Sequence, residues 1–313
     1  MIVRERPSGL RLFLVLRGSV LQRIRLTLLL NILLATLVTV MHGNLFSLKI
    51  TLTAIPFTLI GLPLAIFLGF RNTTAYDRYW EARKLWGEIV HRTRTLSRQC
   101  QGLIDLPVPL DPARRDDDVR VRMVHRAIAF VHALRLHLRS QSDDALLQRW
   151  LPAQDWPRVA QSSVRPEAIM QGLGQDLRQC LREGRIDPCL AAGIDTTLSA
   201  MTASAASCER IRNTPVPFSY TLLLHRTAYL YCFLLPFGLV DTTGFMTPFV
   251  VAIVAYTFFG LDALGDEIEE PFGLESNDLP LDTLCRAMEI NLRESLGETD
   301  LPPPLLPVDY LLT

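Results

Sequence analysis

The feature that most constrains this chain is an uncharged apolar stretch that continues directly into a charged amphipathic one. Residues 50–70 contain no charged side chain, and about 20 helical residues are enough to cross the hydrocarbon core of a bilayer. Beyond Arg71 the apolar side chains recur every three or four residues, as in an amphipathic helix: Ala75, Tyr79, Ala82, Leu85, Trp86, Ile89 and Leu96. Charged residues occupy the other side of this helix: Asp77, Glu81, Lys84, Glu88 and Arg92. The sequence therefore predicts one helix that leaves a membrane and continues as a cytoplasmic strut.

Three more apolar stretches divide the chain into membrane and soluble parts. Residues 26–48 and 242–261 are uncharged, and residues 215–240 are interrupted only by His225 and Arg226. The middle of the chain is charged, amphipathic and broken by Pro and Gly, and no run alternates well enough to predict a sheet. We therefore predict an all-α membrane protein with four transmembrane helices plus a large cytoplasmic helical block. The expected parts are a cytoplasmic N-terminal segment (1–25), transmembrane helices 1 and 2 (26–70), a cytoplasmic helical domain (71–213), transmembrane helices 3 and 4 (214–264), a cytoplasmic acidic and helical segment (265–300) and a Pro-rich C-terminal tail (301–313).

Basic residues gather at one end of these spans. Arginines precede the first span at positions 4, 6, 11, 17, 23 and 25, and Arg71, Arg78, Arg83 and Lys84 follow the second. The connectors 42–47 and 241–247 contain neither Lys nor Arg. Because basic residues favour the cytoplasmic side, we expect both termini and the middle block in the cytoplasm. Asn31 inside the first span leaves a re-entrant or interfacial helix open as an alternative.

Charge and cysteine spacing argue against several other classes of protein. The formal net charge is zero, which gives no electrostatic reason to expect a nucleic-acid partner. The six cysteines form no CxxC pattern and fall in segments placed in the membrane or the cytoplasm, where thiols stay reduced. We expect no disulfide, no metal centre and no cofactor, since no glycine-rich phosphate loop is present either.

Three blocks of sequence, in the same order, resemble the bestrophin family and its bacterial branch in particular. They are residues 61–70 (GLPLAIFLGF) with the charged continuation 71–88, residues 208–218 (CERIRNTPVPF) continuing to 225–227 (HRT), and residues 270–273 (EPFG). The resemblance covers most of the chain. It implies a homopentameric ion channel, not an enzyme, which lies in the lipid bilayer of the bacterial inner membrane and carries small monovalent ions through a central pore.

The resemblance also assigns roles along that pore. Leu62, Ile66 and Phe70 are four residues apart, so they share one helix face. On most transmembrane helices such a stripe faces lipid or another helix. In bestrophins the matching residues form apolar rings that make a narrow neck, and such a constriction can close a pore because water leaves it readily. The family has a second constriction at the cytoplasmic exit, for which our candidate is Cys180, with an ordinary buried helix cysteine as the alternative.

The sequence constrains the permeant ion and the role of the acidic segment less than it constrains the pore. We favour monovalent cations such as sodium, because a bacterial relative resembling this chain passes them, and keep chloride as the alternative because animal relatives conduct it. Glu267, Glu270, Glu275 and Asp278 form a possible cation site, since animal bestrophins hold a regulatory calcium here. The acidic run is thinned in this chain, so we expect these carboxylates to pair with arginines instead.

Two other classes of function remain as rivals. A solute carrier would usually show repeated halves with broken helices, and no such repeat is visible. An intramembrane enzyme could use His225 with Asp262 or Asp266 as an acid–base pair, but no nucleophile or metal motif accompanies them. Pairing of His225 and Arg226 with Asp241, Asp262 or a neighbouring helix is the simpler expectation.

Overall fold

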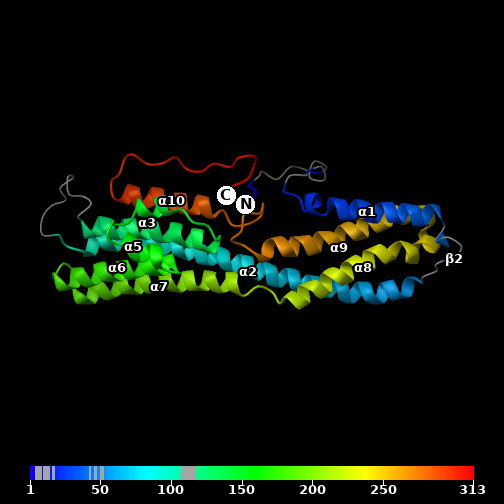
Figure 1. Cartoon of the computed structure of the whole chain (residues 1–313), viewed down its shortest axis with the longest axis horizontal. Helices are drawn as coiled ribbons and strands as arrows, with labels where there is room; N and C mark the ends of the chain where they lie inside the picture. Colours follow the sequence, from blue (N-terminus) through cyan, green and yellow to red (C-terminus); the bar gives the residue numbers. More distant parts are fainter. Residues whose placement is uncertain are drawn as a thin grey trace.

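The computed structural model describes residues 1–3, 9, 15, 18–41, 44–45, 48–49, 53–106 and 118–313. Figure 1 shows an elongated molecule with one group of helices at each end and both termini near the middle. The regular elements in the described residues are α1 (Leu21–Val40), β1 (Asn44–Leu45), β2 (Leu48–Lys49), α2 (Ala54–Leu103), α3 (Val119–Leu138), α4 (Asp144–Gln148), α5 (Trp156–Gln161), α6 (Arg165–Arg182), α7 (Pro188–Asn213), α8 (Phe218–Thr243), the 3-10 turn η3 (Gly244–Met246), α9 (Thr247–Glu269) and α10 (Leu281–Ser295).

Helix α2 runs through both groups of helices and confirms the predicted join. It contains 50 residues, which corresponds to a length of about 75 Å. Its first part packs with α8 and α9, and its second part packs with α3, α7 and α10 (Figure 1). The two groups are therefore connected by one uninterrupted helix. Pro63 lies inside this helix and does not end it.

The first group consists of α1, the first part of α2, α8 and α9, which coincide with the four predicted spans. Three helical runs among the described residues are long and apolar enough to cross a membrane: Leu21–Val40, Ile55–Leu103 and Phe218–Glu269. The last run contains both α8 and α9, which fold back on each other at η3 (Figure 1). Large apolar side chains point outward from this group, among them Leu29, Leu33 and Leu37 of α1. The chain is thus an all-α membrane protein.

Polar and small residues inside this bundle are accommodated by close contacts. Asn31 is fully buried and donates from Nδ2 to the carbonyl of Cys232 at 3.0 Å. Gly238 of α8 lies so close to Phe57 of α2 that an added Cβ would come within 2.2 Å of the ring. The polar residue in the first span therefore packs against α8.

The second group is built around α3, which packs against α2, α6 and α10 and touches α4 and α7. Its side chains are buried along almost the whole helix, including Met123, Ile128 and Phe130. Asp118 caps its N-terminus by accepting from the N–H of Arg120 at 2.8 Å. This block holds the largest apolar core of the protein.

The ends of the chain meet between the two groups. The predicted extended tail, residues 301–313, runs back along α10 (Figure 1). The N–H of Val3 donates to the carbonyl of Tyr310 at 2.8 Å, and the N–H of Leu312 donates to the carbonyl of Met1 at 2.9 Å. The tail is therefore held against the same molecule by backbone hydrogen bonds.

The outer connector differs from the prediction, and some residues used to predict the orientation lie outside the described residues. Asn44–Leu45 and Leu48–Lys49 pair as a short antiparallel hairpin, and α2 begins at Ala54 rather than at residue 50. A tight connector needs residues to reverse the chain, which shortens the helix at its outer end. The arginines at positions 4, 6, 11 and 17 and the connector residues 42–43 and 46–47 lie outside the described residues.

Candidate ion pathway

The three predicted neck residues lie on the outer face of α2. Leu62, Ile66 and Phe70 are 67%, 47% and 62% exposed in the protomer. Leu64 and Leu68, on the opposite face of the same helix, are buried against α8. The protomer thus leaves the neck stripe uncovered, free to face lipid, another subunit or a pore.

The end of this stripe nearest Arg71 is held against α8. Tyr220 donates from its hydroxyl to the carbonyl of Phe67 at 3.2 Å. The rings of Phe67 and Phe70 meet edge to face, with centroids 6.4 Å apart. The hydroxyl of Thr74 donates to the carbonyl of Phe70 at 3.0 Å. Phe70 therefore ends the apolar stripe, and polar groups begin within one turn.

Arg71, the first residue beyond the neck, joins α2 to α9 through a buried ion-pair network. Its side chain has no exposed surface, and Nη1 donates to Oδ1 of Asp262 at 2.8 Å. Nη2 pairs with Asp266 and lies 3.7 Å from Oε2 of Glu269. His225 of α8 contacts the other oxygen of Asp262, with 2.6 Å between Nδ1 and Oδ2. The network fixes the position of α2 at the level where the neck ends, and it confirms the pairing of His225 with Asp262.

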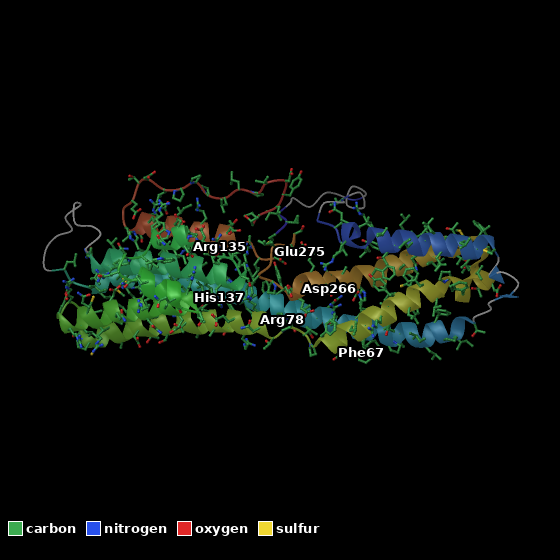
Figure 2. The ribbon with its side chains drawn as sticks, viewed as in Figure 1. Phe67, Arg78, Arg135, His137, Asp266 and Glu275 are labelled. Atoms are coloured by element: carbon green, nitrogen blue, oxygen red, sulfur yellow. The ribbon has the colours of Figure 1, made fainter. Side chains whose placement is uncertain are left out.

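Arg78 makes a second junction two turns farther along α2. Its guanidinium donates to the carbonyls of Ile211, Thr214 and Glu269, at 2.6, 2.5 and 3.2 Å. These carbonyls belong to the C-terminal ends of α7 and α9, where helices leave acceptors unpaired. Figure 2 places Arg78 between the two groups of helices. One side chain thus connects the strut to the chain segment that enters α8.

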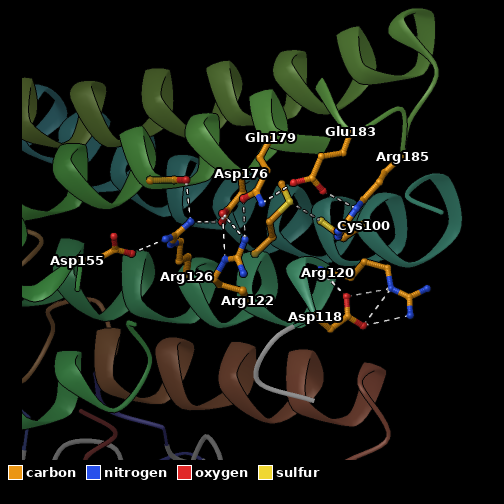
Figure 3. A network of polar contacts seen from close by, with 12 residues as sticks. Cys100, Asp118, Arg120, Arg122, Arg126, Asp155, Asp176, Gln179, Glu183 and Arg185 are labelled. Carbon is orange, nitrogen blue, oxygen red and sulfur yellow. Dashed lines mark hydrogen bonds and ion pairs between the residues drawn. The ribbon is translucent and has the colours of Figure 1, made fainter. Parts of the chain in front are cut away.

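A buried charge network holds α6 against α3 in the second group of helices (Figure 3). Arg122 donates from Nε to Oδ1 of Asp176 at 3.0 Å. Arg126 pairs with the other oxygen of Asp176 and with Asp155, and donates to the carbonyl of Gly172 at 2.8 Å. The orientation of α6 is therefore set by charged groups as well as by its apolar face.

Cys180 does not lie where the predicted exit ring requires. Its side chain is fully buried in the apolar core, in the same cluster as Cys100 of α2. Burial also raises the pKa of the Cys180 thiol. A side chain that its own subunit covers completely offers no surface to a central pathway. The structure argues against a Cys180 ring and fits the alternative of a buried helix cysteine.

Cys189 is an exposed thiol, and no motif around it in the sequence predicts a role for it. All six cysteines are free, and the other five are buried. Cys189 is the second residue of α7, and its N–H donates to Oδ1 of Asp187 at 2.7 Å. It lies where α6 turns into α7, at the end of the block far from the membrane helices (Figure 1). The Asp187-Pro188 pair, typical of a helix start, was the available signal that this cysteine lies at a helix end.

The acidic segment after α9 surrounds a cavity of about 430 Å³. Its lining contains the four predicted residues together with other acidic groups and one arginine: Glu267, Glu270, Glu275, Asp278, Asp266, Glu269 and Arg23. Asp278 accepts from the N–H of Glu275 at 2.7 Å, and Asn277 donates to Oε1 of Glu267 at 3.1 Å. Burial raises the pKa of Asp278 to about 6. The four predicted residues are thus brought together, with Glu275 exposed at the edge (Figure 2).

The expected pairing of this segment with arginines is found for two of its members. Asp266 and Glu269 contact Arg71. Two of the four predicted residues, Glu267 and Asp278, use amide and backbone donors instead. In the part of the chain that the structure describes, no group of three or more His, Cys, Asp or Glu side chains is arranged to hold a metal ion.

Comparison with known proteins agrees with this architecture. Residues 1–294 match the family model described as bacterial/fungal bestrophin protein. The chain is 44% identical to a "voltage-dependent anion channel-forming protein" of Mesorhizobium japonicum, over 99% of this chain and 96% of the relative. It is 42% identical to a protein of the same description in Escherichia coli K12, over 98% of each.

A solved structure gives the same result for the fold. The crystal structure of a bacterial bestrophin homologue from Klebsiella pneumoniae superposes with a TM-score of 0.81 and 38% identity, over 88% of this chain and 100% of that one. The relatives are described as channel-forming proteins, and this chain is accordingly not an enzyme. With the family model matched across almost all of its length, the chain belongs to the bestrophin family.

Proposed function

We propose that this chain forms a homopentameric ion channel of the bacterial inner membrane, with its pore along α2 and its termini in the cytoplasm. The observation that carries the proposal is the exposed stripe of Leu62, Ile66 and Phe70 on a helix that leaves the membrane without a break. Five copies of this stripe around one axis would make an apolar neck. Such a neck can gate by excluding water, with no charged group in the constriction.

The permeant ion is proposed to be a small monovalent anion. The resemblance to a cation-passing bacterial relative favours cations, but the relatives from Mesorhizobium japonicum and Escherichia coli K12 are both described as anion channel-forming. These descriptions support the chloride alternative. The neck itself offers no charge, so the sign of the ion has to be selected by groups outside Leu62, Ile66 and Phe70.

The exit of the pathway is proposed to lie at Cys189 in place of Cys180. Cys189 is exposed at the distal end of the cytoplasmic block, whereas Cys180 is buried. A membrane-impermeant thiol reagent added from the cytoplasmic side should therefore block the wild-type current. The Cys189→Ser variant should be resistant and the matched Cys180→Ser variant should remain sensitive. The opposite pattern would return the exit to Cys180.

The proposal is tested by the reversal potential of the purified protein in a planar bilayer under a sodium chloride gradient. We expect unitary currents that reverse near the chloride equilibrium potential. Reversal near the sodium equilibrium potential would keep the channel but contradict the proposed anion selectivity. Absence of current, with solute exchange in vesicles, would support a carrier instead.

A further inference from the structure

The exposed face of α2 does not end at the neck. Past Phe70 the same face continues into the cytoplasmic block, where Asp77 and Lys84 are both exposed. Seven residues rotate an α-helix to about 20° short of two full turns, and fourteen residues to about 40° short of four. Asp77 and Lys84 therefore project to nearly the same side of α2 as Phe70. They stand about 10 Å and about 21 Å beyond it along the helix axis.

The other charged residues on this section of α2 are occupied or turned away. Arg71 and Arg78 are bonded to α9 and to the ends of α7 and α9. Glu81 pairs with Arg210 at 2.6 Å. Arg83 is exposed, but it is rotated by about 140° from Phe70 around the helix.

Asp77 and Lys84, in contrast, have no partner among the residues that the structure describes. No described residue forms an ion pair or a side-chain hydrogen bond with either of them. Lys84 is also one of two lysines in the chain; the other is Lys49. A free ammonium group and a free carboxylate therefore follow the apolar stripe on the face that the proposed pore uses.

We infer that Asp77 and Lys84 form two opposed charged rings on the cytoplasmic side of the neck, and that these rings set which sign of ion the channel passes. The inference rests on the proposed function, because only the pentamer makes rings of these side chains. Five ammonium groups attract anions into the vestibule, and five carboxylates attract cations. Clefts lined by one sign of charge raise the local concentration of the opposite ion by tenfold or more. Because the neck carries no charged side chain, we assign selection for the sign of the ion to the charged groups next to it.

The experiment measures the ratio of chloride to sodium permeability from the reversal potential of each variant in the same gradient. Lys84→Gln should lower this ratio on the order of tenfold, and Lys84→Glu should lower it further. Asp77→Asn should raise it by a similar factor, because the cation-attracting ring is removed. The matched control is Arg83→Gln, which removes a positive charge next to Lys84 in sequence but about 140° around the helix from Phe70. Its ratio should equal that of the wild type.

The outcomes separate this inference from the proposed function. One outcome is that the wild type, Arg83→Gln and the Lys84 and Asp77 variants all conduct with the same ratio of chloride to sodium permeability. This outcome would refute the charged rings and would leave the proposed channel function intact. If the wild type carries no current, the proposed function itself fails. Weaker shifts at high salt than at low salt would support the rings, since salt screens exposed charges. A change that Arg83→Gln reproduces would overturn the assignment to this face.

Discussion

The two halves of α2 place apolar side chains in opposite surroundings. In the membrane half Leu62 is 67% exposed and Phe70 is 62% exposed, whereas in the second half, which packs with α3, α7 and α10, Trp86, Ile89 and Leu96 are completely buried. The second half therefore contributes to folding through its apolar face. The first half exposes the same kind of residue, so the stripe of Leu62, Ile66 and Phe70 adds little to the stability of a protomer and stays uncovered, as the proposed pore requires.

The change between the two halves takes place at Arg71. Its buried side chain meets Asp262, Asp266 and Glu269 of α9. Removing one member of a buried ionic cluster leaves the others unpaired, which is costly in a low-dielectric interior. Arg71 therefore stabilises the packing of α2 against α9, whereas the proposed neck residues directly before it are left uncovered.

The largest effect is expected from Arg71→Met. The buried carboxylate of Asp262 would lose its guanidinium partner, and the loss of stability should be about 3–5 kcal/mol. Thermal unfolding in detergent, followed by size-exclusion chromatography, would show this as a large drop in Tm or as a failure to assemble. Arg83→Met, an exposed arginine on the same helix, is the control and should unfold like the wild type. Equal Tm values for both variants would refute the role of Arg71.

A matched pair of truncations tests the comparison directly. Leu96→Ala opens a cavity in the core around the second half of α2 and should cost about 2–5 kcal/mol. Leu62→Ala removes the same atoms from an exposed site and should leave the free energy of unfolding of the protomer nearly unchanged, because little surface there is buried on folding. Chemical unfolding of the two variants in detergent measures both values. A larger loss for Leu62→Ala than for Leu96→Ala would reverse the comparison.

The smallest effect concerns Asp278 in the acidic segment beside the junction. Its pKa in the folded protein is raised to about 6, mainly because the carboxyl is buried. A raised carboxyl pKa contributes stability that is present below its unfolded value, near 4, and is lost as the pH rises through 6. Asp278→Asn should thus be more stable than the wild type at pH 7 by about 1 kcal/mol, with the difference shrinking toward pH 4. Chemical unfolding of both proteins at pH 7 and at pH 4 measures this difference, and equal stabilities at both pH values would contradict the effect of burial on Asp278.

Much of the architecture follows from local pattern. The spacing of Ala75, Ala82, Trp86, Ile89 and Leu96 predicted one face of a helix, and all five side chains are completely buried. Four apolar stretches predicted the membrane helices: three of them contain no charged residue, the fourth is interrupted only by His225 and Arg226, and their lengths match a bilayer. Both inferences need only neighbours along the chain.

Contacts between distant segments were beyond this kind of inference. Arg71 and Asp262 are 191 positions apart, and nothing local distinguishes Asp262 from the carboxylates that follow it. Cys180 and Cys189 show a different difficulty. The two cysteines lie on either side of the turn that joins α6 to α7. Cys180 is buried inside α6, whereas Cys189 is exposed in the first turn of α7, beside Asp187. Helix packing, which one sequence does not reveal, decides which thiol is exposed.

The central claim is that the exposed stripe on the membrane half of α2 is the neck of a pore. It is tested most directly by the unitary conductance of the Leu62→Ala, Ile66→Ala, Phe70→Ala triple variant in a planar bilayer. The control replaces three equally exposed leucines of α1, Leu30, Leu33 and Leu37, with alanine. We expect a clearly higher conductance or open probability for the neck variant than for the wild type, and no change for the control. A neck variant that conducts like the wild type would contradict the claim.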